Sequence, residues 1–162
     1  MLRSPKADLA APWLRRGLLW VAALTTAGTG VELAVERHWT QPVQFVGWGA
    51  VGLLALALAL LVRAPSRGRI RLARIIAAAV LFCAAWGVWE HVYSNYDAGP
   101  LDYRYGETWD SLSEASRWWL AITKTVGPSP PLAPGALSQA SLCVLLATLR
   151  HPRFASSTDE DT

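Results

Sequence analysis

The chain has 162 residues, of which 52% are hydrophobic and 17% are charged, whereas an ordinary soluble domain carries about 25% charged residues. Its apolar residues gather into four blocks, each close to the ~20 residues that a membrane-crossing helix needs, which argues against a water-soluble globule. The net charge of +3 does not indicate nucleic-acid binding, because the basic residues lie at the ends of the apolar blocks, where membrane topology accounts for them. Both cysteines, Cys83 and Cys143, lie inside apolar blocks, which disfavours a disulfide framework or a thiolate metal site.

Four membrane spans are predicted in chain order, at residues 17–35, 43–62, 75–93 and 132–149. The stretches outside them are each under ~40 residues, too short to bury a core unaided. Residues 1–153 are therefore expected to form a single all-α domain, a bundle of four transmembrane helices. Residues 154–162 are expected to be a disordered, acidic cytoplasmic tail.

The distribution of Lys and Arg predicts the orientation of the spans. Eleven of the 15 basic residues precede span one, lie between spans two and three, or follow span four, and only four lie in the other two loops. By the positive-inside rule, both termini are cytoplasmic and the loops after spans one and three face outward. This topology is that of a multi-pass membrane protein.

The longest outward loop, residues 94–131, is not expected to be all coil. Between Trp109 and Thr123, apolar and small residues recur at helical spacing, which predicts a short helix in the outer headgroup region. The following Gly127-Pro128-Ser129-Pro130-Pro131 breaks that helix before the fourth span.

Ionisable residues at membrane depth are costly and usually turn toward a partner or a water-filled cavity. In this chain they gather at the outer ends of spans one and three, which predicts a polar pocket in the outer half of the bundle. Carboxylate and imidazole are suitable ligands for a divalent metal such as Zn, Mn or Fe. The metal ligands would be Glu32, Glu36, His38, Glu90 and His91. The pocket would be completed by Gln44, Asn95, Asp97, Ser138 and Gln139.

The spacing of these residues gives the metal hypothesis little support, because neither H-E-x-x-H nor E-x-x-H occurs on one helix. The competing interpretation is that the groups bond to one another or to water at the interface. No motif activates a serine, and no glycine-rich phosphate loop is present. The sequence thus identifies no cofactor and favours a protein that is not an enzyme.

Two motifs lie in and after the third and fourth predicted spans. They are Gly87-Val88 with His91 and Asn95, and Pro131-Leu132-Ala133-Pro134-Gly135 with Gln139 and Arg150-His151-Pro152. These motifs resemble those of a group of small, uncharacterised bacterial membrane proteins with four predicted spans. The resemblance implies a four-helix fold in a bacterial inner membrane and brings no activity. Trp89-Glu90 before His91 departs from the pattern of that group.

Two functions are consistent with these features. The first is an accessory or interaction component of the membrane, whose partners are the lipid bilayer and other membrane proteins or a second copy of the chain. The alternative is a transporter subunit or redox partner that handles a metal or small ligand through the Glu and His residues. No nucleic-acid partner is expected.

Overall fold

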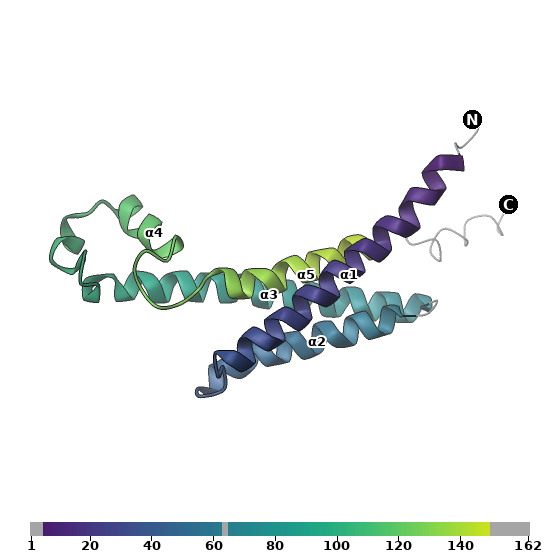
Figure 1. Cartoon of the computed structure of the whole chain (residues 1–162), viewed down its shortest axis with the longest axis horizontal. Helices are drawn as coiled ribbons and strands as arrows, with labels where there is room; N and C mark the ends of the chain where they lie inside the picture. Colours follow the sequence, from purple (N-terminus) through teal and green to yellow (C-terminus); the bar gives the residue numbers. More distant parts are fainter. Residues whose placement is uncertain (1–4, 63–64, 150–162) are drawn as a thin grey trace. The chain divides into compact units, whose positions relative to one another are not determined.

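The computed structural model describes residues 5–62 and 65–149, with side chains from residue 12 onward, and all regular structure in these ranges is helical. The long helices are α1 (Pro5–Val35), α2 (Phe45–Leu61), α3 (Arg67–Ala98) and α5 (Leu132–Thr148), and α4 (Glu114–Ile122) is short (Figure 1). Three 3₁₀ helices connect them, η1 (Pro42–Gln44), η2 (Gly99–Leu101) and η3 (Gly106–Ser111). The predicted tail at 154–162 lies outside the described residues.

The described residues divide into two compact units. The first contains the chain up to Phe82 and from Ala136 onward, and the second is Cys83–Gly135. Each unit is built differently, the first from long apolar helices and the second from one helix end with a folded loop.

Three helical segments, Pro12–Val35, Pro42–Leu61 and Arg67–Leu101, are long and apolar enough to cross a membrane. They match the first three predicted spans. The fourth, Leu132–Thr148, is apolar but has 17 residues, which corresponds to ~26 Å of helix against a hydrocarbon core of ~30 Å. The chain is thus an α-helical protein of the membrane type, and the fourth crossing stays a prediction.

The core of the first unit contains many small side chains, whereas many of its large apolar side chains are exposed. Large exposed residues and small buried ones are typical of helices that pack against each other in lipid. The buried alanines are Ala22, Ala50, Ala57, Ala73, Ala77, Ala140 and Ala147. The exposed side chains include Leu24, Val31, Leu53, Leu56, Ile75 and Phe82.

Helices α1 and α2 pack together as a hairpin (Figure 1). A Cβ added at Gly30 would lie 3.6 Å from Val51, and one at Gly47 would lie 3.4 Å from Leu33, so these glycines lie at the contact between the two helices. The buried stripe of α2 repeats at intervals of four and three residues. It consists of Ala50, Leu54, Ala57 and Leu61.

The turn between α1 and α2 is closed by backbone and amide hydrogen bonds. Arg37 has a positive φ of 50°, and its N–H donates to Ala34 O while the His38 N–H donates to Leu33 O, the pattern of a Schellman motif. The Gln44 side-chain oxygen accepts from the backbone N–H of Thr40 (2.7 Å) and of Gln41 (3.0 Å). Gln44 therefore holds this turn.

The short helix predicted between Trp109 and Thr123 is present as α4, but its predicted start is wrong, because the chain is divided there into η3 and α4. Ser113 has extended backbone angles (φ −63°, ψ 150°), and its side chain accepts from the Ser116 N–H. This N-cap satisfies a free donor in the first turn of α4 and separates Trp109, in η3, from the helix that follows. Helical spacing was present, but the capping serine starts a new helix inside it.

Candidate functional site: the lobe formed by residues 83–135

The second unit, called the lobe below, is organised by one face of α3 and its extension into η2. Residues 87, 91, 95 and 99 recur every fourth position and so lie along one stripe of the helix. His91 and Asn95 contact the segment that folds back onto α3 through their side chains. Gly87 and Gly99 have no side chain, and other residues lie close to where a Cβ would be. From Gly87 to Gly99, the contacted residues are Pro134, Pro130, Ser129 and Trp109.

Asn95 is the centre of this stripe and is 0% exposed. Its Nδ2 donates to the backbone oxygens of Ala121 (3.1 Å) and Ser129 (2.8 Å), and its Oδ1 accepts from the Ser129 N–H (2.9 Å). One side chain thus joins α3 to the end of α4 and to the segment after it. Gly127, with φ +76°, passes so close that a Cβ there would overlap Asn95, which only glycine avoids.

His91 fixes the same segment one turn earlier. Its Nδ1 lies 2.8 Å from the Pro130 oxygen, and because a carbonyl oxygen only accepts, Nδ1 carries the hydrogen. In the neutral ring, Nε2 is then the atom with a free lone pair. This bond also fixes the ring orientation, as such bonds do for metal-ligating histidines.

Aromatic rings attach α4 to α3. The Tyr96 ring is stacked on Trp118 at 4.4 Å between centroids and meets the edge of Trp109 at 5.6 Å. Trp118 also stacks on Trp89 at 5.5 Å. Trp109 is 3% exposed and occupies the space that a Cβ on Gly99 would need. These ring pairs each contribute about 0.5–1.5 kcal/mol beyond their buried area.

Arg104 ties the first turn of the loop to the segment after α4. Its guanidinium binds both carboxylate oxygens of Asp102 at 3.3 Å and donates to the Thr125 carbonyl oxygen. The rings of Tyr103 and Tyr105 lie 5.2 and 5.4 Å from its central carbon, within cation–π range. The hydrogen bonds from Arg104 hold the pKa of the Asp102 carboxyl below its usual value.

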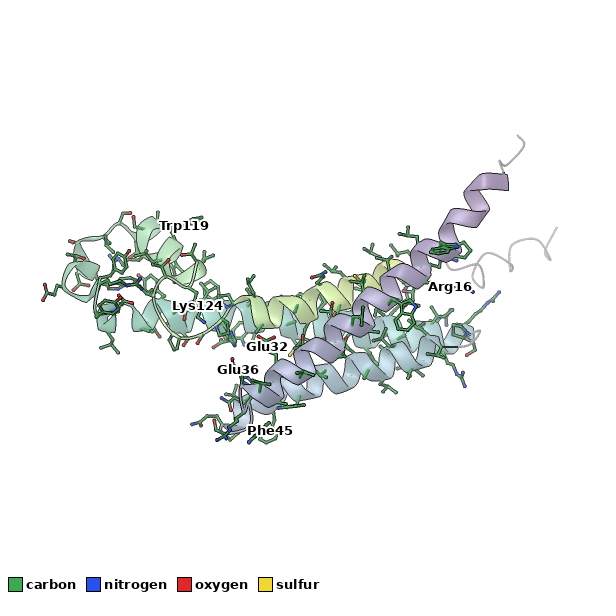
Figure 2. The ribbon with its side chains drawn as sticks, viewed as in Figure 1. Arg16, Glu32, Glu36, Phe45, Trp119 and Lys124 are labelled. Atoms are coloured by element: carbon green, nitrogen blue, oxygen red, sulfur yellow. The ribbon has the colours of Figure 1, made fainter. Side chains whose placement is uncertain are left out.

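The end of α4 has the same geometry as the end of α1. Lys124 has φ 54°, its N–H donates to Ala121 O, and the Thr125 N–H donates to Leu120 O. These two bonds form a Schellman motif. The chain reverses at Lys124 (Figure 2), and Ser129 in the segment that follows bonds to Asn95.

The outer surface of the lobe carries large side chains that nothing in the lobe covers. Leu101, Tyr103 and Trp119 are 86%, 92% and 66% exposed. Leu101 and Tyr103 border a surface depression, whose remaining lining residues are Ala98, Asp102, Gly127 and Pro128. Ordered, uncovered apolar side chains on a folded surface are a mark of interaction sites.

The predicted metal ligands are divided between the units. Glu32 and Glu36 lie one turn apart at the end of α1 (Figure 2) and are exposed, with His38 half-buried after them. Glu90 is exposed and His91 half-buried in the lobe. Within the described residues of either unit, no three His, Cys, Asp or Glu side chains are grouped as a metal site requires. A site that combines both units stays a prediction.

The predicted pocket residues are divided in the same way. Gln44, Ser138 and Gln139 belong to the first unit, and Asn95 and Asp97 to the lobe. Asp97 is exposed, whereas Asn95 is buried and uses its amide to hold the loop. Of the residues predicted on α3, Glu90 and Asp97 are exposed, whereas His91 and Asn95 lie on the face that organises the lobe.

Sequence reasoning also missed Arg104 and Gly99. Arg104 had no signal beyond its position two residues after Asp102, and Gly99 had only the four-residue spacing from Asn95.

No protein-family model matches the chain, and no curated protein and no solved structure matches it.

Proposed function

We propose that this chain is a four-span protein of a bacterial cytoplasmic membrane, with both termini cytoplasmic, that serves as an accessory protein by presenting the lobe to a protein partner outside. The observation that carries the proposal is the pairing of a fixed interior with an uncovered exterior. Asn95 and the aromatic rings order the lobe internally, and yet Leu101 and Tyr103 remain almost fully exposed. A preorganised surface binds with a smaller loss of entropy than a flexible loop.

The topology is tested by reporters fused to the chain. A reporter fused after Arg153 is expected to be cytoplasmic, and one inserted near Gly106 is expected to lie outside. The reason is that most basic residues lie on the side of the membrane that carries both termini and the loop between spans two and three. The reverse pattern would place the lobe inside and remove the basis of the proposal.

The interaction is tested by site-specific photocrosslinking in membranes of the native host. A photoreactive residue in place of Tyr103 is expected to give a discrete protein adduct, whereas one in place of Phe82, which is 78% exposed on the apolar part of α3, should react with lipid. Glu107 is a matched control on the same lobe, since it is also exposed. Absence of a protein adduct at Tyr103, or equal adducts at all three positions, would contradict the proposal.

A second candidate function is the handling of a metal ion or small ligand by the chain. It is favoured by the oriented imidazole of His91, whose Nδ1 is held by Pro130. Elemental analysis and the visible spectrum of the purified protein test it, with a Glu90→Gln, His91→Gln double variant as comparison. A stoichiometric metal that disappears in the variant supports this function, and a metal-free wild type rejects it.

A further inference from the structure

The first turns of α3 carry an arginine stripe in a segment that has no acidic residues of its own. The segment from residue 37 to residue 89 contains no Asp or Glu, yet it includes Arg63, Arg67, Arg69, Arg71 and Arg74. Among the described residues, the carboxylates of Asp102 and Glu114 pair with Arg104 and Arg117 and not with Arg71 or Arg74. The charges of Arg71 and Arg74 are thus available to a partner outside the protein.

The arginines are arranged by side and not only by number. Arg67, Arg71 and Arg74 are related as i, i+4 and i+7 and lie within about 60° of the helix circumference. They sit beside the buried face that includes Ile70, Ala73 and Ala77. Arg69 lies on the opposite side from Arg71. The positive-inside rule depends only on which side of the membrane the basic residues occupy. It does not explain why three arginines lie along one side of a helix.

An exposed apolar line continues directly from the stripe. Ile75 is one turn beyond Arg71 and is 66% exposed, and Phe82 follows two turns later at 78% exposed. Arg71 is itself exposed. A charged group followed along the helix by exposed apolar side chains matches the arrangement of a phospholipid, whose headgroup lies at the membrane surface and whose acyl chains run inward.

We propose that Arg71 and Arg74, at the start of α3, form a binding site for the phosphate headgroup of an anionic phospholipid, with its acyl chain along Ile75 and Phe82. Guanidinium groups bind phosphate oxygens in a bidentate manner. Juxtamembrane clusters of four to eight basic residues are typical of anionic-lipid binding. The site lies in the first unit and does not depend on the proposed function of the lobe.

The test is native mass spectrometry of the purified full-length chain in detergent, with equal amounts of phosphatidylglycerol and phosphatidylcholine that have the same acyl chains. The wild type is expected to retain phosphatidylglycerol in preference to phosphatidylcholine. Arg71→Gln is expected to reduce that preference about fivefold. Arg69→Gln removes the same charge from the opposite side of the same helix and is expected to leave the preference nearly unchanged.

Four results would overturn the proposal. Equal retention of both lipids by the wild type would show that no anionic site exists, and equal losses in Arg71→Gln and Arg69→Gln would reduce the effect to net charge. Should Arg71→Gln fail to fold by circular dichroism, Arg71→Lys replaces it, and an unchanged preference there would remove the bidentate role. The fourth result concerns the acidic residues Asp159, Glu160 and Asp161. A preference that appears only when they are neutralised would assign the stripe to these carboxylates.

Discussion

Replacement of Asn95 by alanine is expected to open the lobe locally while leaving the long helices formed. The substitution removes three hydrogen bonds and leaves the Ser129 oxygen and the Ser129 N–H without partners, whereas the Ala121 oxygen keeps its bond from the Lys124 N–H. A buried polar group left unpaired costs about 1–3 kcal/mol. Because the two Ser129 groups are only partly buried, the sum is about 2–3 kcal/mol, or about a 30- to 150-fold increase in the population of the open state.

Hydrogen–deuterium exchange of the intact protein measures this opening. The informative amides are those of Thr125 and Val126, which donate to Leu120 O and do not contact the substituted side chain directly. Ser94→Ala is the matched control, because its hydroxyl also meets Ser129, at 3.2 Å, but on the exposed surface. That variant is expected to cost under ~1 kcal/mol. Exchange in Asn95→Ala that is no faster than in Ser94→Ala would refute the central role of Asn95.

Three further substitutions test the lobe in the same assay. Lys124→Gly is expected to slow exchange and stabilise the lobe by about 1 kcal/mol, because glycine adopts the positive φ without strain. Gly99→Ala is expected to destabilise it by about 1–3 kcal/mol, because the added Cβ overlaps the buried Trp109 ring. Asp102→Asn is expected to flatten the acid dependence of lobe stability. Arg104 lowers the folded-state pKa of Asp102, so its stabilisation is present at neutral pH and is lost as the pH falls through that lowered pKa.

Each of these variants has a comparison within the chain. Thr123→Gly places glycine at a φ of −78°, where it brings no relief of strain, and is expected to destabilise α4 or leave it unchanged. Gly28→Ala adds a Cβ where no atom lies within 4 Å and is expected to be harmless or mildly stabilising. For Asp102→Asn, the wild type and variant are compared at each pH, which cancels the intrinsic pH dependence of exchange. Parallel wild-type and variant profiles at acid pH would contradict the role of the Asp102–Arg104 pair.

The long helices could be predicted from the sequence because their signal is local. An apolar run of about 20 residues is sufficient to indicate a span, and spans one to three coincide with described helices. Their ends could not be predicted as well. Helix α3 begins at Arg67, eight residues before the apolar block predicted from Ile75. Arginine is a good helix former, so the helix extends beyond the apolar block that marks the span.

The lobe could not be predicted because its decisive contacts join distant residues. Asn95 and Ser129 are separated by 34 positions, and His91 and Pro130 by 39. No periodicity links such pairs. The sequence did contain one usable signal, the four-residue spacing of His91 and Asn95 within a longer series that glycines begin and end. Gly87 and Gly99 have no side chain and therefore gave no sign of a functional site in the sequence. In the structure, they mark where other residues pack closely against the helix.

The stripe from Gly87 to Gly99 also determines where the chain can change in length. Inserting one residue within it would rotate every later position by about 100°, so that the amide of residue 95 and the space at residue 99 would no longer face their partners together. In the connection around residues 102–108, no such helical spacing has to be maintained. Its constraint is the set of bonds from Arg104 to Asp102 and Thr125. Related sequences are therefore expected to carry insertions and deletions in that connection, with the spacing between the two glycines held at twelve residues. A gap pattern of this kind would identify relatives of this chain more reliably than its apolar blocks.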